Sequence, residues 1–409
     1  MKVLVVGSGG REHALCWALD RSPSVSDVVV VPGNDGMENA ARVIGGAGDE
    51  RGVRIVADAE RPDLVVIGPE APLVAGWADA LRRDGYAVLG PGAAGARLEG
   101  SKRYAKEFME RHGVPTARFA GFDDLDDALA HLERVGAPIV VKDSGLRAGK
   151  GVTVAETLEE ARTAVEAIFQ EPGAEVVLEE RLAGPEISVT LLVDANTHVA
   201  LPPSRDHKRA YDGGRGPNTG GMGAVAPVPL SAEEREALER QVVKPVMRGL
   251  RADGVPYSGV LYVGVMRTED GFKVLEFNCR FGDPETQVLM PLLASDAGEL
   301  FRAVAEDRLA EVEVRVAPGA SACVVMAAPG YPGSPKVGVP VGLPRELPEG
   351  TLLFSAGLHG RPPVSKGGRV VNAVGIGATV AEAVRRAYRL VDAVRFEGAL
   401  VRRDIGAGM

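Results

Sequence analysis

Two oxygen-bearing side chains lie two residues apart at the end of an apolar run, residues 272–277, that is typical of a strand. Because side chains alternate along a strand, Glu276 and Asn278 point to the same face, and Arg280 follows two residues later. Carboxylate and amide oxygens suit Mg²⁺ or Mn²⁺, and Mg²⁺ is usually bound together with nucleotide phosphates. An arginine there can hold a carboxylate or a transferring phosphoryl group. The spacing predicts a phosphate and metal site.

The composition is that of an ordinary enzyme. A chain of 409 residues predicts two to four domains. The net charge of -9 argues against nucleic acid or an anionic membrane as a bulk partner. Cys16, Cys279 and Cys323 are too few and too widely spaced for a disulfide framework or a zinc knuckle. No apolar run has transmembrane length, so we expect a cytoplasmic protein, and a monomer.

Strand and helix patterns alternate along the first hundred residues. Short β-rich runs at 2–6, 27–31, 64–67 and 87–89 are separated by helical segments such as 11–20 and 72–84. This βαβ rhythm predicts a parallel sheet covered on both faces. It ends near the breaker cluster Gly90-Pro91-Gly92.

A smaller α/β unit follows a helix at about 102–112. Its expected elements are strands at 138–143, 152–155 and 176–180 and a helix opened by the capping box Thr157…Glu160. A loop rich in Gly, Asn and Pro, 204–229, precedes a helix at 231–252. From about residue 320 the tail has its own strands and a final helix at 380–394.

The first glycine loop, at residues 7–13, follows a strand and opens a helix, a position that favours an anion. Two details count against a dinucleotide: Glu12 replaces the third glycine, and the second strand ends at Pro32 without an acidic residue. We therefore expect the loop to hold a single phosphate, with a plain βα turn as the alternative.

The second glycine loop spans residues 142–151. It is one residue short of a Walker loop and leads into a strand, so it is better interpreted as a flap over triphosphate, or as a simple hairpin. Lys142 lies in an apolar strand, where a lysine requires an anionic partner.

The third loop combines Asp206-His207-Lys208-Arg209 with the glycine-rich stretch 216–223. Loops of this length are usually functional or disordered, and the mixture of charge, amide and glycine favours a substrate loop. His207 is either a proton acceptor or merely a hydrogen-bonding residue.

Nine short motifs in order carry a family resemblance that runs from residue 1 to about residue 406. They are GSGGREHA (7–14), GPEAPLVAG (68–76), LEGSK (98–102), APIVVK (137–142), AGKGV (148–152), DHKR (206–209), GPNTGGMGA (216–224), EFNCRFGDPETQ (276–287) and RRDIG (402–406). Together they resemble the phosphoribosylamine–glycine ligase family, also called glycinamide ribonucleotide synthetases, of purine biosynthesis.

The resemblance implies an α/β and α+β multidomain chain with an ATP-grasp fold. A Rossmann-like N-terminal domain (1–101), an ATP-grasp domain (102–319, with a lid at about 119–186) and a C-terminal α/β domain (320–409) would enclose ATP, glycine and 5-phosphoribosylamine. In this family the glycine carboxylate attacks the γ-phosphate of ATP, giving glycyl phosphate and ADP. The amine then displaces phosphate from the acyl carbon.

Roles carried over by matching position divide into four groups. The metal, Mg²⁺ or Mn²⁺, would be held by Glu276 and Asn278. Contacts to ATP would come from Lys106, Lys142, Gly145, Gly149, Lys150, Gly151, Glu179, Glu180, Leu182 and Glu186. The two small substrates would meet Gly9, Gly10, Glu70, Asp206, Lys208, Arg209, Asn218, Thr219, Gly220, Gly221 and Arg280. Catalysis would rest on Arg280, Lys142, Asp206 and His207.

Several positions depart from the family pattern. Asp143, Ser144 and Arg147 replace Ala, Asp and Ala in the flap, and we expect Arg147 to be solvated rather than to bind phosphate. Arg181 replaces an aromatic residue at the adenine hinge, and Gly214 replaces an aspartate. The strand before Glu276 offers Gly264 where related enzymes place a second metal carboxylate, so we expect fewer protein ligands for one ion.

Three alternatives remain. A related ATP-grasp carboxylase would phosphorylate bicarbonate instead of glycine. A nicotinamide dehydrogenase shares only the first glycine loop. A non-catalytic nucleotide-binding module would bind ATP without turnover. The presence of Lys142, Glu276, Asn278 and Arg280 argues against this alternative.

Overall fold

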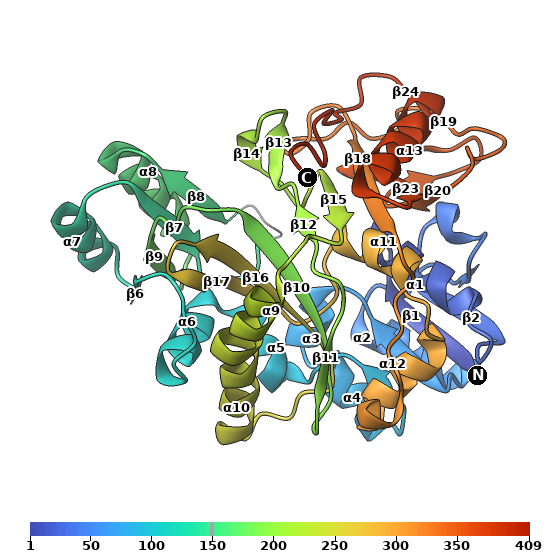
Figure 1. Ribbon diagram of the computed structural model, residues 1–409, viewed down its shortest axis with the longest axis horizontal. Coiled ribbons are helices and arrows are strands. Elements are labelled where there is room, and N and C mark those ends of the chain that lie inside the picture. The colour runs from blue at the N-terminus through green and yellow to red at the C-terminus, as the bar shows by residue number, and fades with distance from the viewer. Residues whose placement is uncertain (148–150) are drawn as a thin grey trace.

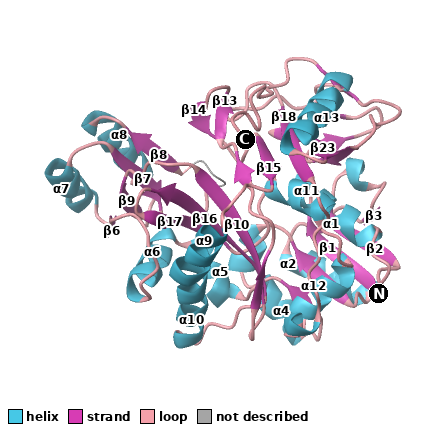
Figure 2. Ribbon diagram, viewed as in Figure 1, coloured by secondary structure: helices cyan, strands magenta, loops and turns pink. Residues whose placement is uncertain are grey.

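The N-terminal part of the computed structural model, which describes residues 1–147 and 151–409, is a parallel sheet in the order β3-β2-β1-β4-β5. Its strands are β1 (Lys2–Gly7), β2 (Asp27–Pro32), β3 (Arg42–Val43), β4 (Leu64–Ile67) and β5 (Val88–Leu89). The intervening helices are α1 (Gly10–Asp20), η1 (Asp35–Met37), α2 (Glu50–Glu60), α3 (Glu70–Val74), α4 (Trp77–Arg83) and α5 (Ala93–Gly100). The predicted parallel sheet is confirmed, and helices lie on both of its faces (Figure 2).

The helix predicted over 72–84 is wrong as a single element. The chain forms α3 and then α4, because Gly76 between them adopts φ +83°, a left-handed conformation that ends one helix before the next begins.

The lid is a four-stranded antiparallel sheet in the order β6-β9-β7-β8. It follows α6 (Lys102–Arg111) and consists of β6 (Phe119–Phe122), α7 (Leu125–Val135), β7 (Ile139–Asp143), β8 (Val152–Ala155), α8 (Leu158–Ile168) and β9 (Val176–Glu180). The predicted capping box opens α8: the Thr157 hydroxyl accepts from Glu160 N, and Glu160 accepts from Thr157 N. The lid forms the left end of the molecule in Figure 1.

The central sheet, order β11-β10-β16-β17, is antiparallel and carries the candidate metal ligands at its edge. Its strands are β10 (Glu186–Val193), β11 (His198–Ala200), β16 (Gly259–Thr268) and β17 (Gly271–Asn278). The helix predicted at 231–252 consists of α9 (Ala232–Leu238), a π-helical turn η2 (Glu239–Val243) and α10 (Lys244–Ala252). Pro245 lacks an N–H, and the wider turn precedes it.

The C-terminal sheet has the order β12-β15-β18-β23-β20 and includes strands that lie far apart in the sequence. Its strands are β12 (Arg205–Asp206), β15 (Gly223–Ala226), β18 (Ala320–Ala327), β20 (Thr351–Ser355) and β23 (Arg369–Gly377). The prediction of a loop over 204–229 is therefore wrong. Its ends pair into this sheet, and a hairpin, β13 (Arg209–Tyr211) with β14 (Arg215–Asn218), lies between them.

Short elements complete the chain. They are α11 (Glu285–Leu289), η3 (Met290–Leu292), α12 (Ala297–Ala305), η4 (Leu309–Glu311), the pair β19 (Val341–Gly342) and β24 (Arg395–Phe396), and the pair β21 (Leu358–His359) and β22 (Val364–Ser365). The longer helix α13 (Val380–Ala393) lies at the predicted position of the final helix. Among the described residues, no helix is long and apolar enough to cross a membrane.

Helix α1 is buried between two sheets. Residues of β1 and β2 pack against one part of it, and Cys323 and Val374 of the C-terminal sheet belong to the same core cluster. Helix α11 contacts β15, β18 and β23, and α1 contacts β20, so both helices meet the C-terminal domain, which lies beside the N-terminal domain in Figure 1. This packing brings the first glycine loop, the Asp283 segment and β23 together.

Candidate active site

The end of β17 has the predicted alternation. Glu276 pairs in register with Gly264 and Asn278 with Tyr262 on β16. Both side chains are half-buried, while Phe277 between them is buried in the core. One carboxylate and one amide therefore share the face that does not enter the hydrophobic core.

Glu276 is neutralised by a lysine from the third loop. Lys208 Nζ lies 3.0 Å from Glu276 Oε1 and 3.3 Å from Glu186 Oε2. Lys208 lowers the pKa of Glu276 to about 2, so this carboxylate is ionised at neutral pH. An ionised carboxylate beside an amide oxygen fits a hard divalent cation. In the described part of the chain no group of three or more His, Cys, Asp or Glu side chains could hold a metal, so water and phosphate oxygens would complete the coordination.

Two lysines converge on one buried carboxylate. Glu179 Oε2 lies 3.0 Å from Lys106 Nζ, and its Oε1 lies 2.9 Å from Lys142 Nζ. Lys142 Nζ also donates to the carbonyl of Leu275, one residue before Glu276. Burial lowers the pKa of Lys106 to about 8. Two cations share one anion, which leaves net positive charge for the phosphates of a nucleotide.

The other residues assigned to ATP lie along the edge of the lid. The Glu180 carboxylate, at the end of β9, pairs with Arg118 at 2.7 Å and with Lys273 at 3.6 Å, and Leu182 follows it. Arg181, the departure at the adenine hinge, forms an ion pair with Glu156. The side chains of Glu180 and Arg181 are therefore both engaged in ion pairs with other side chains.

Two of the flap residues that differ from the family pattern, Asp143 and Arg147, determine the conformation at the start of the flap. Asp143 Oδ1 accepts from Gly145 N at 2.9 Å, and Asp143 Oδ2 accepts from Arg147 Nε at 2.6 Å. Arg147 also pairs with Glu171, so the expectation that it is merely solvated is wrong. Gly151 closes the loop by accepting from Asp143 N at 2.8 Å. The assignments on Gly149 and Lys150 lie outside the described residues.

Arg280 is held between two carboxylates. Its Nη2 donates to Glu99 Oε1 at 2.7 Å, and its Nε lies 3.3 Å from Glu70 Oε2. Burial opposes the charged form, but Glu99 and Glu70 outweigh it and raise the pKa of Arg280. The guanidinium is therefore permanently charged and fixed in position beside β17.

The first glycine loop binds a carboxylate of its own chain. Gly9 N donates to Glu12 Oε2 at 2.6 Å, and the Glu12 side chain is buried. A Cβ at Gly7 or Gly68 would meet Glu12 within 2.5 or 2.1 Å, so both positions need glycine. Glu12 Oε1 also accepts from Arg11 Nε at 2.6 Å, so this carboxylate has both a backbone and a side-chain partner within the protein.

A cavity of about 320 Å³ opens beside this loop. It is lined by Ser8, Gly9, Arg11, Pro69, Trp77 and Asp283, among others. Gly10 faces elsewhere: a Cβ there would lie 2.1 Å from Asn372 Nδ2 and 2.7 Å from Gln287 Nε2. The glycine at position 10 thus allows α1 to approach the C-terminal domain.

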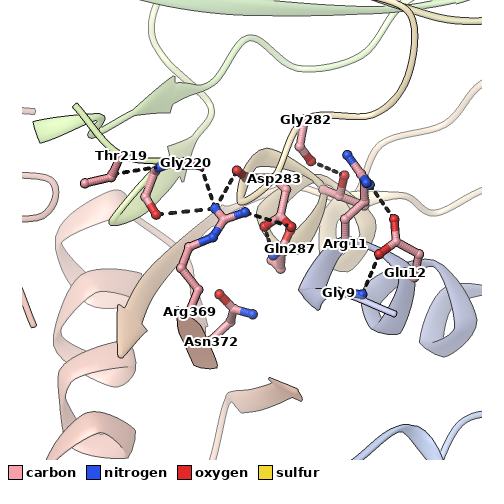
Figure 3. Close-up of polar contacts among 12 residues, drawn as sticks. Gly9, Arg11, Glu12, Thr219, Gly220, Gly282, Asp283, Gln287, Arg369 and Asn372 are labelled. Carbon is pink, nitrogen blue, oxygen red and sulfur yellow. Dashed lines mark hydrogen bonds and ion pairs between the residues drawn. The ribbon is translucent and has the colours of Figure 1, made fainter. Parts of the chain in front are cut away.

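Arg369, at the start of β23, connects three segments around this cavity (Figure 3). Its Nη1 donates to the carbonyls of Gly220 at 2.5 Å and Asp283 at 2.8 Å, and its Nη2 lies 3.1 Å from Asp283 Oδ2. Asp283 Oδ1 also accepts from Gln287 at 2.7 Å. The C-terminal domain therefore fixes the Asp283 carboxylate that lines the cavity.

Asp206 and His207 of the third loop are both half-buried, but they have different surroundings. Asp206 Oδ1 is buried without a hydrogen-bond partner, and burial together with Glu285 raises the pKa of Asp206. The two ring nitrogens of His207 face backbone groups, Gly223 O and Gly406 N, each at 3.3 Å, and burial lowers the pKa of His207 to about 4. This arrangement favours packing of the C-terminal tail over proton transfer by His207.

The other predicted substrate residues of the third loop lie in two different surroundings. Thr219 holds the loop to Lys208, since its hydroxyl donates to Lys208 O at 2.8 Å and accepts from Gly221 N at 3.0 Å. Arg209 and Asn218 line a different cavity, of about 840 Å³, between β8 and the C-terminal domain. The structure thus does not bring these two residues to the cavity of the first glycine loop.

Two residues of the site were missed by sequence reasoning. Glu99 lies inside the LEGSK motif, and its position before Lys102 was a signal that was not used. Arg369 lies in a tail strand with no local motif, and only the packing of β23 against α11 brings it to Asp283.

Family models match nearly the whole chain. The phosphoribosylglycinamide synthetase N domain matches residues 1–99, the ATP-grasp (A) domain residues 100–286 and the C domain residues 321–408. A phosphoribosylamine–glycine ligase of Mesorhizobium japonicum is 45% identical over 415 residues, covering 99% of this chain and 98% of the relative. One from a Nostoc species is 47% identical over 420 residues, with 99% of each chain covered.

Solved structures agree with these relatives. The phosphoribosylamine–glycine ligase of Thermotoga maritima has a TM-score of 0.85 and 35% identity, covering 99% of this chain and 100% of that one. The biotin carboxylase domain of Hydrogenobacter thermophilus 2-oxoglutarate carboxylase, solved with MgADP and bicarbonate, has a TM-score of 0.75 at 19% identity, covering 98% and 91%. The second likeness shows the fold alone, which is the ATP-grasp fold.

Proposed function

We propose that this chain, which belongs to the phosphoribosylglycinamide synthetase family of ATP-grasp ligases, joins glycine to 5-phosphoribosylamine. The products are glycinamide ribonucleotide, ADP and phosphate, as part of purine biosynthesis. The match of all three family domains in order, with the charged side chains at the end of β17, carries the proposal. We expect a cytoplasmic monomer.

Activation of glycine is the first step of the proposed reaction. A glycine carboxylate oxygen attacks the γ-phosphorus of ATP, the bond to the β,γ-bridging oxygen breaks, and ADP leaves. Lys106 and Lys142 would bind the phosphates, and Arg280 would hold the carboxylate or the transferring phosphoryl group. Such transfers depend mostly on positioning and charge neutralisation.

Glu276 and Asn278 would hold Mg²⁺ or Mn²⁺. When bound, the cation supplies charge neutralisation at the β- and γ-phosphates. Lys208 contacts Glu276 in this structure, so it would exchange this partner for an anionic substrate group when a cation takes its place. Glu186 would bond the ribose hydroxyls of ATP, and the flap residues, Gly145 and Gly149–Gly151, would cover the triphosphate.

The second step joins the amine to the acyl carbon. The nitrogen of phosphoribosylamine attacks the carbonyl of glycyl phosphate, the C–O bond to phosphate breaks, and the nitrogen loses a proton. The cavity beside Gly9 and Glu70 would hold phosphoribosylamine, with Gly10 supporting the loop. Asp206, with its raised pKa and unpartnered oxygen, is the acceptor we assign for the proton.

The proposal is tested by ADP release from the purified protein with Mg-ATP and freshly generated phosphoribosylamine, with and without glycine. We expect ADP only with glycine, in amounts equal to the amide product. ADP that follows bicarbonate instead would keep the fold and overturn the function. ATP binding without turnover under all conditions would indicate a nucleotide-binding module.

A further inference from the structure

The carboxylate of Glu99 accepts from two consecutive residues that directly follow β17. Glu99 Oε1 accepts from Arg280 Nη2 at 2.7 Å, and Glu99 Oε2 accepts from Cys279 N at 2.7 Å and from Cys279 Sγ at 3.1 Å. The side chain is 6% exposed and comes from α5, on the opposite side of the domain boundary from β17. Neither the predicted ligands nor the predicted catalytic residues include it.

Glu99 also determines which end of the Asn278 amide lies against it. The two groups on that side, Glu99 Oε1 and the carbonyl of Phe277, are both acceptors, so the amide nitrogen must face them. In that orientation the nitrogen donates to Glu99 at 2.9 Å and to Phe277 O at 3.2 Å. The oxygen of the Asn278 amide is thereby left on the side away from Glu99.

We infer that Glu99 is a positioning residue for the metal site, which orients the Asn278 amide so that its oxygen is the atom available to the cation. This role rests on the proposed function, in which Asn278 is a metal ligand. The amide alone has no such preference, because its oxygen and nitrogen have nearly the same shape. An acceptor such as Glu99 on one side specifies that the oxygen lies on the other.

Glu99 is not itself a further ligand. A carboxylate offers about four lone-pair positions, and four donors already point at Glu99: Asn278 and Arg280 on one oxygen, and the N–H and S–H of Cys279 on the other. The same carboxylate fixes Arg280 from one side while Glu70 faces it from another. One buried acid therefore aligns both the metal ligand and the catalytic arginine.

Glu99→Gln is the direct test. Glutamine has the same shape but one acceptor oxygen, and its NH₂ group must face one set of donors. With that group toward Asn278, the asparagine amide turns and presents nitrogen to the cation. We expect the Kd for Mn²⁺, measured by electron paramagnetic resonance in the presence of ADP, to rise by about tenfold or more. Cys279→Ser keeps both donors to Glu99 and is the control, with an unchanged Kd.

A second substitution separates orientation from structural support. Asn278→Asp replaces the amide by a carboxylate, which has an oxygen toward Glu99 and an oxygen toward the cation, so the orientation of the group no longer matters. In the wild-type background, however, the new carboxylate repels that of Glu99. In the Glu99→Gln background the new carboxylate accepts from Gln and still offers an oxygen to Mn²⁺. We expect Asn278→Asp to tighten Mn²⁺ binding by about tenfold more in the Glu99→Gln background than in the wild type, a coupling that a double-mutant cycle measures.

Additive effects of the two substitutions in the cycle would overturn the inference. A folded Glu99→Gln protein whose melting temperature is lowered but whose Kd for Mn²⁺ equals that of the wild type would also overturn it. If Glu99→Gln does not fold, Glu99→Asp replaces it: the charge remains but the reach to Asn278 is lost, and an unchanged Kd is again the contradicting result. Because Mn²⁺ and ADP binding require neither glycine nor phosphoribosylamine, failure of the ligase assay and failure of this inference are separate outcomes.

Discussion

The two halves of the site are built in different ways. On the nucleotide side, Glu276, Asn278 and Arg280 come from one strand end, so the sequence spacing already states their geometry. On the side of the first glycine loop, the cavity depends on segments from three domains. Arg369 joins Asp283 and Gly220, which lie 86 and 149 residues from it in the sequence. The relative positions of functional side chains on one strand can be predicted from their spacing in the sequence. The relative positions of side chains on several elements depend on how those elements pack.

The largest expected effect tests the local half. Glu276→Ala removes the charged metal ligand and leaves Lys208 beside an empty position, so we expect turnover to fall by about a thousandfold or more while the fold is retained. Steady-state ADP release and circular dichroism measure the two quantities. Glu269→Ala, on the exposed turn of the same hairpin, is the control and should keep wild-type turnover.

Arg280→Ala is the second test of the same half. Loss of a preorganised charge next to the reacting groups should lower turnover by roughly a hundredfold or more. The buried Glu99 and the half-buried Glu70 would then lack their shared cation, so the melting temperature should fall as well. A turnover number close to wild type would remove Arg280 from the chemistry.

Arg369→Ala tests the assembled half. We expect the KM for phosphoribosylamine to rise by about tenfold, because the Asp283 and Gly220 segments lose their common donor, and the KM for ATP to change little. The matched control is Arg385→Ala, an exposed arginine on α13. Equal increases in both KM values would indicate a general loss of structure and would end the distinction between the two halves.

The smallest effect concerns pH and the packing of the C-terminal tail. Burial lowers the pKa of both His13 and His207 from 6.5 to about 4. The neutral forms are favoured in the folded protein, so their contribution is fully present above about pH 6.5 and is lost as the pH falls toward 4. Each contributes about 2 kcal/mol of the stability lost between pH 7.5 and 5.

Urea unfolding at pH 7.5 and 5 measures this loss. His207→Gln keeps a side chain that can meet Gly223 and Gly406 but cannot titrate, so its stability should depend less on pH than that of the wild type. An unchanged pH dependence in that variant would show that His207 does not titrate differently on folding.

The predictions from sequence were most accurate for helices and strands that a local residue pattern determines. Four of the five strands of the parallel sheet, β9 and the capping box of α8 are where the patterns indicate, since each depends on side chains within a few residues. The two-residue strand β3 was not predicted. The ion pair between Asp143 and Arg147 was not foreseen, because a flap arginine offers no clue to its partner.

The third loop was misjudged for the opposite reason. Its glycines and prolines are typical of irregular structure, yet Asp206 ends β12 and Gly223 begins β15. These two strands pair with each other, and β15 also pairs with β18. That pairing is set by the C-terminal domain, about a hundred residues later in the chain. Arg369 and Glu99 were missed on the same ground: each acts through partners that only the fold brings near.

If this site activates the glycine carboxylate as an acyl phosphate, one carboxylate oxygen must pass from glycine to the phosphate that is released. The protein is supplied with Mg-ATP, phosphoribosylamine and glycine labelled with ¹⁸O in both carboxylate oxygens, and the phosphate and amide products are analysed by mass spectrometry. We expect one labelled oxygen in each phosphate released and one in each amide formed. Phosphate without label, accompanied by ADP and amide, would contradict it.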